Sequence, residues 1–212
     1  AKGPITSLSE IGACGHRAVH GGEAITGVAV VDDKLEQIME KYSDLAPLHN
    51  PPNLIGMRAA RKILGTIPQV ATFDTAFHHT LPEVAYLYPL PHEFYEKHRV
   101  RRYGFHGISH RYVTQRAAAL LGVGNRPWRA ITCHLGNGCS MAAIRNGKSV
   151  DTTMGFTPLE GLVMGTRPGD TDPGIIFYLM RKYKMNAAAI EDLLNKSSGL
   201  KGISGLKDFR DI

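Results

Sequence analysis

Residues 131–147 combine side chains and backbone types that suit the binding of phosphate. Gly136 and Gly138 flank Asn137, and His134 stands just before this turn. Glycine reaches positive φ without a Cβ penalty, so we expect the backbone N–H groups of Gly136 and Gly138 to converge on an anion. A plain β-hairpin would use the same residues, and the Gly-Asn-Gly turn taken alone favours that simpler interpretation.

Charged and imidazole side chains also recur in five other segments that are rich in small residues and prolines. These are residues 16–22, 45–52, 73–78, 103–110 and 164–173. Together with the glycine turn, and in this order, they resemble the acetate kinase family of the acetate and sugar kinase, heat-shock and actin superfamily. The resemblance runs from about Gly15 to the last residue. Pro168 stands where the family often has Ser.

The resemblance implies that Arg17 and Arg167 flank a phosphoryl group during its transfer. Charge spreads over the phosphoryl oxygens in that reaction, and a planar guanidinium can donate to two oxygens at once. On an extended strand Arg17 shares a face with Val19, and His16 shares the opposite face with His20. Either arginine, taken alone, could equally form a surface ion pair.

Four apolar residues are implied to line a pocket for a short acyl group, namely Val19, Leu48, Phe105 and Pro158. Each of them, taken singly, is more simply explained by core packing. One extra methylene is worth only about 1 to 3 kcal/mol in such a pocket. The sequence therefore leaves acetate, propionate and butyrate open as substrates.

By the same resemblance, His106 hydrogen-bonds the transferring phosphoryl group and stabilises the transition state together with Arg167, while His49 and His134 have supporting roles. Imidazole can donate to a phosphoryl oxygen while neutral. His106 and His110 have the spacing of zinc ligands on a helix, but Gly107 follows His106 directly and no catalytic Glu does. This argues against zinc.

Asp74 follows the predicted strand 67–73, where the resemblance implies a catalytic aspartate near the metal. A carboxylate there could hold Mg²⁺ (or Mn²⁺) or orient Arg17, with the main magnesium ligand outside this chain. The phosphates of the co-substrate, ATP or ADP, would lie against a loop next to these groups. Its residues are His134, Leu135, Gly136, Asn137 and Gly138. The sequence contains neither a P-loop nor a dinucleotide-binding Gly-x-Gly-x-x-Gly motif.

The implied reaction is direct in-line transfer of the γ-phosphoryl group of ATP to acetate, giving acetyl phosphate and ADP, a step in acetyl-CoA biosynthesis. A propionate or butyrate kinase is the alternative within the family. Two alternatives are not enzymes: an incomplete fragment that binds only the anion, and a basic scaffold for nucleic acid. The last predicts salt-dependent retention on DNA.

Hydrophobic periodicity indicates how these residues are positioned. It predicts strands at 24–31, 67–73, 130–134, 140–144 and 148–153, with a type I′ turn at Asn146-Gly147. It predicts helices at 33–42, 51–64, 109–121 and 186–194, and one after Asp172 and Pro173. Residues 81–92 and the Gly/Ser-rich segment after residue 194 are expected to be irregular.

The predicted fold class is α/β, and the resemblance implies an actin-like ATPase (ribonuclease H-like) two-domain fold that is incomplete at both ends. Residues 1–76 would be part of the first domain. Residues 77–212 would begin the second, with a β meander and helices. The chain lacks an initiator Met and ends in what looks like a starting helix at 206–212. We therefore expect a central fragment, inactive alone, of a protein about twice as long.

Composition fits an ordinary soluble enzyme, with 43% hydrophobic and 21% charged residues. The formal net charge of +6 suits anionic ligands. No basic run interleaved with aromatic residues indicates nucleic-acid binding, and no run reaches the roughly 20 apolar residues of a membrane span. The three cysteines form no metal-ligand pattern, which favours a reducing cytoplasm. The resemblance implies a homodimer.

Overall fold

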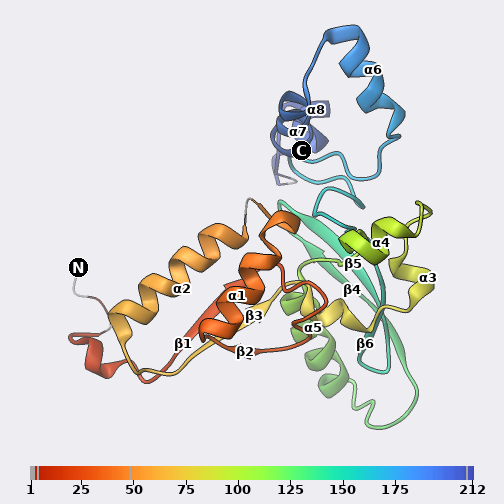
Figure 1. The fold of residues 1–212 in the computed structure, drawn as a ribbon. Helices are drawn as coiled ribbons and strands as arrows, with labels where there is room; N and C mark the ends of the chain where they lie inside the picture. The colour runs from red at the N-terminus through yellow and green to blue at the C-terminus, as the bar shows by residue number, and fades with distance from the viewer. Residues whose placement is uncertain (1–2, 4, 48, 209) are drawn as a thin grey trace. The chain divides into compact units, whose positions relative to one another are not determined.

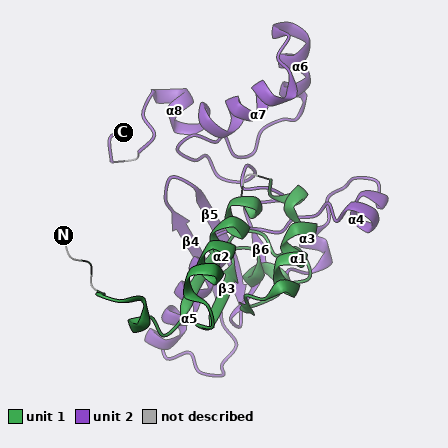
Figure 2. Cartoon of the chain, turned by 60° about the vertical axis from the view of Figure 1, so that its left-hand side comes forward, with its two compact units in different colours: residues 1–79 green, residues 80–212 purple. Residues whose placement is uncertain are grey.

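The computed structural model describes residues 3, 5–47, 49–208 and 210–212. The chain divides into two compact units, residues 1–79 and 80–212 (Figure 2). The identity of each unit as part of an actin-like domain stays a prediction.

Unit 1 contains a mixed three-stranded sheet. Its strands are β1 (Cys14–Ala18), β2 (Ala29–Val30) and β3 (Gln69–Phe73), in the order β1-β3-β2. β1 runs parallel to β3, and β2 runs antiparallel to it. The prediction of a strand over 24–31 is correct only for β2. A turn at residues 22–24 takes up the start of that segment; Gly22 in this turn has φ 58°, and the ring of Tyr42 fills the space where a Cβ would stand.

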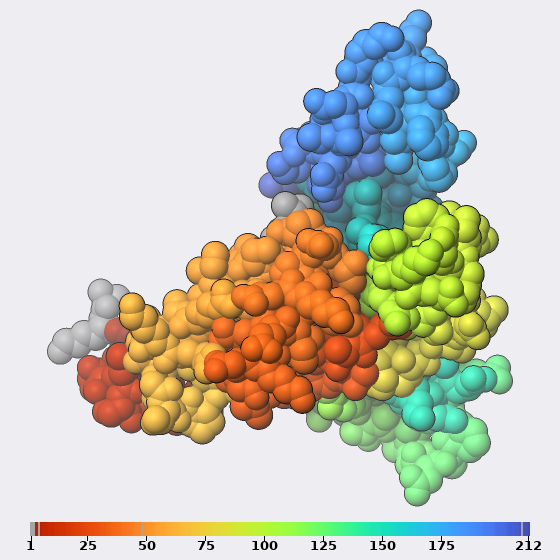
Figure 3. All heavy atoms as spheres, in the orientation of Figure 1, coloured from red at the N-terminus to blue at the C-terminus, as the bar shows by residue number. Residues whose placement is uncertain are grey.

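Two helices cover one face of this sheet. They are α1 (Asp33–Lys41) and α2 (Asn50–Leu64), both predicted from periodicity (Figure 1). The carboxylate of Asp32 accepts a hydrogen bond from the Leu35 backbone N–H, which caps α1. The core between the helices and the sheet includes Leu35, Met39, Leu54, Met57, Ala71 and Phe73. Side chains of α1 and α2 form a continuous surface on the face seen in Figure 3.

The other face of the sheet carries two of the predicted site residues, Arg17 and Asp74. Arg17 in β1 pairs with Thr72 in β3, so both side chains project from the face opposite the helices. Alternation along β3 brings Asp74, one residue past the strand, to the same face. The predicted strand 67–73 therefore delivers Asp74 beside Arg17.

Unit 2 is built around an antiparallel meander, as predicted. Its strands are β4 (Arg129–Leu135), β5 (Cys139–Arg145) and β6 (Lys148–Thr152). Asn146 and Gly147 have φ 52° and 79°, the signs that a type I′ turn requires. Helix α5 (Gly107–Leu120) packs on β4 and begins two residues before its predicted start.

Helices predominate in the remainder of unit 2. The segment predicted to be irregular contains α3 (Glu83–Tyr86), and α4 (Glu93–His98) follows it. α6 (Gly174–Tyr183) and α7 (Ala187–Lys196) confirm two predicted helices. α8 (Gly199–Ser204) replaces the expected Gly/Ser loop and ends at Gly205, which has φ 79°. The prediction of a helix beginning in 206–212 is wrong, since none of the described residues there is helical.

Three short 3₁₀ helices complete the described elements. They span Leu8–Glu10, Ser43–Leu45 and Ala76–Thr80. None of the helices in the described part of the chain is long and apolar enough to cross a membrane.

Candidate active site

Arg17 and Asp74 form a two-point ion pair in unit 1. Arg17 Nε donates to Asp74 Oδ1 at 3.1 Å, and Arg17 Nη2 donates to Asp74 Oδ2 at 2.6 Å. Asp74 is 3% exposed, whereas 65% of the Arg17 side chain is accessible. The hydrogen bond to Asp74 raises the pKa of Arg17. The structure thus brings the two predicted residues together and orients the guanidinium through the buried carboxylate.

The chain after β1 is held by two asparagines from the first turn of α2. Asn53 Oδ1 accepts from the Val19 backbone N–H at 3.2 Å, and Asn50 Oδ1 accepts from that of His20 at 3.3 Å. Asn50 Nδ2 also donates to the His20 carbonyl at 3.0 Å. Neither asparagine was predicted as a site residue, although Asn-Pro-Pro-Asn at a helix start is a visible signal. Val19, a predicted pocket residue, is buried and lies two residues after Arg17 in the chain.

His49 is the exposed residue that precedes α2. His20 is fully buried, and its pKa is lowered to about 4 by burial and, secondarily, by the nearby His49. His20 is therefore neutral at physiological pH. Leu48, predicted to line the acyl pocket, lies outside the described residues.

Two predicted histidines stack on each other in unit 2. The ring centroids of His106 and His134 are 4.0 Å apart, with an interplanar angle of 26°. His106 has φ 56° and ψ 19°, a left-handed conformation that is uncommon for a residue with a side chain and often marks a functional position. It directly precedes α5, while His134 lies near the end of β4. Phe105, the neighbour of His106, is buried.

Hydroxyl groups hold these rings in place. Ser140 Oγ lies 2.9 Å from His106 Nδ1 and 2.8 Å from His110 Nε2. Thr132 Oγ1 lies 2.8 Å from His110 Nδ1, and Ser109 Oγ lies 2.9 Å from His134 Nδ1. Burial lowers the pKa of His110 to about 4, with a further contribution from His134. Among the described residues, no group of three His, Cys, Asp or Glu could hold a metal.

The glycine turn differs from the prediction in one respect. Neither Gly136 nor Gly138 has positive φ, and the Gly136 N–H donates to the Gly138 carbonyl at 3.2 Å. The expectation that both N–H groups converge on an anion through left-handed backbone is therefore wrong. Gly138 is needed for space instead, because a Cβ there would lie 2.5 Å from Arg167 Nη2 and 3.4 Å from His106 Nε2.

Arg167 has a different environment from Arg17. Its Nη1 donates to the Pro158 carbonyl at 2.7 Å, so Pro158 meets the site through its backbone. No carboxylate among the described residues pairs with it. Burial lowers the pKa of Arg167, an effect that Cys139 partly opposes. In unit 2, His106, His134 and the glycine turn thus lie around the half-buried guanidinium of Arg167.

A cavity of about 550 Å³ opens beside the glycine turn. A Cβ on Gly165 would lie 2.2 Å from Asn137 Oδ1, so Gly165 allows Asn137 to seat against it. Arg210 binds Asp208 through Nε at 3.0 and 3.1 Å, and this lowers the pKa of Asp208 to about 2. The charged residues Lys207, Asp208 and Arg210 were not predicted as site residues. The cavity is lined by Leu135, Gly136, Asn137, Gly165, Thr166, Leu200, Lys207, Asp208 and Arg210.

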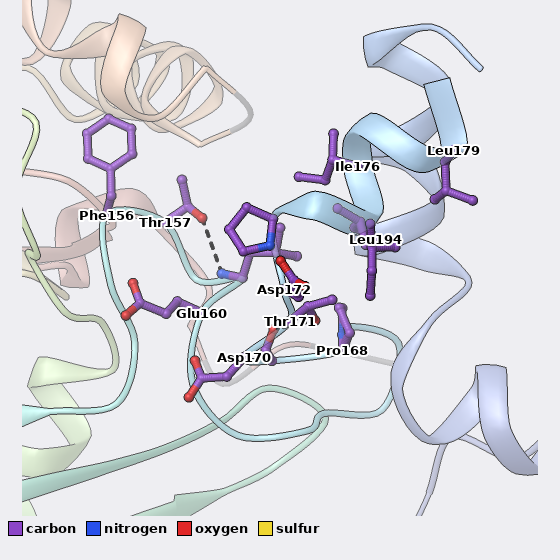
Figure 4. A pocket seen from close by; sticks show the side chains of 14 residues that line it. Phe156, Thr157, Glu160, Pro168, Asp170, Thr171, Asp172, Ile176, Leu179 and Leu194 are labelled. Carbon is purple, nitrogen blue, oxygen red and sulfur yellow. Dashed lines mark hydrogen bonds between the residues drawn. The ribbon is translucent and has the colours of Figure 1, made fainter. Parts of the chain in front are cut away.

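A second cavity, of about 480 Å³, does not suit phosphate. Figure 4 shows Ile176, Leu179 and Leu194 on the side formed by α6 and α7. The polar side chains that line it include the carboxylates of Glu160, Asp170 and Asp172, which would repel an anion. The lining of this cavity therefore does not favour an anionic ligand.

Comparison with known proteins gives concordant matches. The sequence profile of the Acetokinase family matches residues 2–212. The acetate kinase of Caldanaerobacter subterraneus subsp. tengcongensis is 56% identical over 211 residues, which make up 99% of this chain and 53% of that protein. The acetate kinase of Thermoanaerobacter pseudethanolicus is also 56% identical over 211 residues, with the same coverage.

Solved structures agree in fold. The crystal structure of Porphyromonas gingivalis acetate kinase superposes with a TM-score of 0.93 at 51% identity, covering 98% of this chain and 52% of that chain. A propionate kinase from Francisella tularensis gives a TM-score of 0.92 at 45% identity, covering 96% and 53%. These matches confirm the predicted fold class and the resemblance seen in the sequence. The chain spans about half the length of the curated relatives it matches.

Proposed function

The chain belongs to the acetokinase family, and on that premise we propose that the complete protein transfers the γ-phosphoryl group of ATP to acetate. The reverse reaction makes ATP from acetyl phosphate and ADP. The observation that carries this proposal is the environment of Arg167, a half-buried guanidinium with no carboxylate partner among the described residues. A partly desolvated cation gains from an anionic ligand, and phosphoryl oxygens supply one.

In the proposed reaction, a carboxylate oxygen of acetate attacks the γ-phosphorus in line with the leaving group. The bond from the γ-phosphorus to the bridging oxygen breaks, and ADP leaves with that electron pair. Arg167 and His106 donate to the oxygens of the transferring group, whose charge redistributes at the transition state. Because both side chains are already held by protein hydrogen bonds, little reorganisation is needed during the reaction.

Arg17 acts from unit 1 in this proposal. Its Nε and Nη2 are committed to Asp74, which leaves the Nη1 donors for the substrate. Asp74 thereby fixes the direction in which Arg17 presents its charge. The acyl methyl group would meet Val19, Leu48, Phe105 and Pro158, and His49 would have a supporting role.

The donor set of Asp74 is compatible with one ligand to Mg²⁺ (or Mn²⁺). Each of its oxygens accepts one hydrogen bond from Arg17 and retains a lone pair. Magnesium sites of phosphoryl-transfer proteins use one or two carboxylates together with phosphate oxygens, so the main protein ligand would lie outside this chain. When bound, the ion would neutralise charge on the phosphates.

The nucleotide is proposed to lie in the cavity beside the glycine turn. His134, Leu135, Gly136, Asn137 and Gly138 would contact its phosphates, and Lys207 and Arg210 add positive charge to the same cavity. A volume of about 550 Å³ lies within the range of small-molecule sites.

Propionate or butyrate is the alternative acceptor. The likeness to a propionate kinase structure at 45% identity supports propionate within this alternative. A further methylene changes binding by only about 1 to 3 kcal/mol, so acceptor preference depends on a few contacts in the acyl pocket.

The test uses the complete protein, checked by mass, with ATP, Mg²⁺ and acetate, propionate or butyrate in turn. Acyl phosphate formation with the highest kcat/KM for acetate is expected, and it should be lost in Arg17→Ala and Arg167→Ala. A higher kcat/KM for propionate or butyrate would replace the proposal by its alternative. Binding of acetyl phosphate without ATP binding in equilibrium dialysis, and without turnover, would overturn catalysis altogether.

The protein is further proposed to work as a homodimer in the cytoplasm. Cys14, Cys133 and Cys139 are all free thiols, which supports a reducing compartment. Light scattering on the complete protein tests the dimer, and a monomeric mass would contradict it.

A further inference from the structure

Four polar side chains form a continuous hydrogen-bonded series in unit 2. It runs from Thr132 Oγ1 to His110 Nδ1, from His110 Nε2 to Ser140 Oγ, and from Ser140 Oγ to His106 Nδ1, with distances of 2.8, 2.8 and 2.9 Å. Thr132, His110 and Ser140 are all at most 5% exposed. The series thus connects a buried threonine to the histidine that stands beside Arg167.

Proton counting allows only two arrangements for neutral rings. Ser140 is fully buried, and the two rings are the hydrogen-bond partners of its hydroxyl among the described residues. If it accepted from both rings its own proton would be buried without an acceptor, so it donates to one ring and accepts from the other. If Ser140 donates to His106 Nδ1, then His110 Nε2–H donates to Ser140 and Thr132 donates to His110 Nδ1. His106 then carries its own proton on Nε2. In the reverse arrangement every donor becomes an acceptor, and His106 Nε2 carries a lone pair.

Thr132 distinguishes the two arrangements. Among the described residues its hydroxyl has one hydrogen-bond partner, His110 Nδ1. In the first arrangement the Thr132 proton is used in that bond. In the reverse arrangement Thr132 accepts, and its own buried proton has no acceptor, which costs free energy. The lowered pKa of His110 is consistent with a neutral ring in both cases.

The position of His106 Nε2 explains why its protonation matters for binding a phosphoryl group. His106 Nε2 lies beside Gly138, where Arg167 Nη2 also approaches. A cation next to Nε2 would by itself favour a lone pair on that nitrogen. A lone pair there would repel a phosphoryl oxygen, whereas Nε2–H would donate to it. The series of hydroxyl and imidazole groups therefore opposes the effect of Arg167.

We propose that Thr132, His110 and Ser140 are positioning residues that hold His106 as its Nε2–H tautomer, so that it donates to the phosphoryl group beside Arg167. The role of the Nε2–H group as a donor to phosphate rests on the proposed function. The hydrogen-bonded series itself does not, because it is present without substrate.

The first test is long-range proton–nitrogen correlation NMR on the complete protein without substrate, with His106 assigned by loss of its signals in His106→Gln. We expect the Nε2 resonance of a protonated nitrogen and the Nδ1 resonance of an unprotonated one. Thr132→Val keeps the shape of the side chain but removes the hydroxyl, and it should shift His106 toward the other tautomer. Thr132→Ser restores the hydroxyl and should restore the Nε2–H pattern. A His106 that carries its proton on Nδ1 in the wild type would overturn the proposal.

The second test is kinetic. Thr132→Val and Ser140→Ala should lower kcat roughly 10- to 100-fold, as loss of a partner that fixes a histidine tautomer does elsewhere, with a smaller change in KM. Thr132→Ser should recover most of the loss. Equal activity of Thr132→Val and Thr132→Ser would overturn the positioning role. If Thr132→Val proves unfolded, Ser140→Ala with Ser140→Thr as its hydroxyl-retaining match replaces it in both tests.

The two proposals can fail separately. If His106 is the Nε2–H tautomer, loses it in Thr132→Val, and the protein does not phosphorylate acetate, the positioning proposal holds and the proposed function fails. If the protein forms acetyl phosphate normally but His106 is the Nδ1–H tautomer, the proposed function holds and the positioning proposal fails.

Discussion

The two arginines of the candidate site differ in solvent exposure and in the group that each guanidinium binds. Arg17 is largely exposed and binds the buried Asp74 through two hydrogen bonds. Arg167 is half-buried, donates to a backbone carbonyl and has no carboxylate partner among the described residues. Accordingly, the pKa of Arg17 is raised by its hydrogen bond to Asp74, and that of Arg167 is lowered by burial.

The difference separates two ways in which a protein prepares a cation for an anionic ligand. Arg17 is oriented by a counter-charge that the fold supplies, so its loss also affects a buried carboxylate. In the proposed reaction the charge of Arg167 is left for the ligand, so its loss should affect ligand binding and the transition state but not the fold. Substitutions that measure stability and activity together can test this contrast.

The largest expected effect is on catalysis by Arg167→Gln. Removing a donor aimed at the transferring group should lower kcat/KM about 100- to 1,000-fold, or roughly 3 to 4 kcal/mol. Thermal unfolding should be unchanged or slightly higher, because a desolvated charge without a carboxylate is removed. Arg181→Gln on the exposed side of α6 is the matched control, with activity expected within about twofold. Activity of Arg167→Gln within about tenfold of wild type would remove the contrast.

The next effect in size is the loss of unfolding free energy at acidic pH, which should be similar in the two units. His20 in unit 1 and His110 in unit 2 both have a pKa lowered to about 4 by burial. Protonation favours the unfolded chain, where the pKa is ordinary, so their contribution is complete above about pH 6.5 and is lost as the pH falls toward 4. Each should lose about 2 kcal/mol of unfolding free energy by about pH 5.

Urea unfolding near pH 7 and pH 5 checks this expectation. Trp128, the single tryptophan, reports on unit 2, whereas far-ultraviolet circular dichroism reports on both units. His110→Gln should flatten the pH dependence seen by Trp128, and His20→Gln should leave it nearly unchanged. A midpoint that does not move with pH would contradict the assignment of neutral buried rings.

A smaller effect is expected on stability when Arg17 is removed. Arg17→Ala leaves Asp74 buried without its partner, and we expect a loss of about 1 to 2 kcal/mol, less than for a fully buried pair because Arg17 is exposed. Adding Asp74→Asn should recover part of the loss. Chemical unfolding of the single and double variants gives the coupling. Independent, additive effects would show that the ion pair does not stabilise unit 1.

The smallest expected effect compares two glycines near the arginines. A Cβ on Gly138 would meet Arg167 and His106, whereas a Cβ on Gly15 meets nothing within 4 Å. Gly138→Ala should therefore displace the Arg167 guanidinium and lower kcat about fivefold, roughly 1 kcal/mol. Gly15→Ala, the matched control in β1, should leave kcat unchanged. Equal kinetics for both variants would mean that Arg167 tolerates crowding.

The sequence predicted most of the regular elements because their signals are local. The meander follows from alternation and the Asn146-Gly147 turn, and α2 follows from Pro51, Pro52 and its apolar face. The strand predicted over 24–31 was too long because its start belongs to the turn at 22–24, and the apolar Ile25 enters the core without pairing to another strand. α8 was missed because glycine and serine have low helix propensity, which its contacts with residues 164–167 override.

The candidate site was predictable in part for a related reason. Charged and imidazole residues stand out in a sequence, and Asp74 at a strand end was a visible candidate. Ser140 and Thr132 were missed because hydroxyl residues are ordinary in strands. The hairpin register that pairs His134 with Ser140 could have indicated one of them. The role of Gly138 depends on Arg167, which is distant in the sequence, so no local pattern could reveal it.

The pairing of β1 with β3 also bears on how the chain acquires its structure. Cys14 pairs with Gln69, so the sheet of unit 1 cannot close until the segment near residue 73 has been synthesised. The strands of unit 2 are joined by turns of a few residues, and such local pairings form quickly. The unit that leaves the ribosome first is thus expected to be slower to close. During that interval β1 lacks its partner strand, and unpaired strand edges of this kind are what chaperones protect.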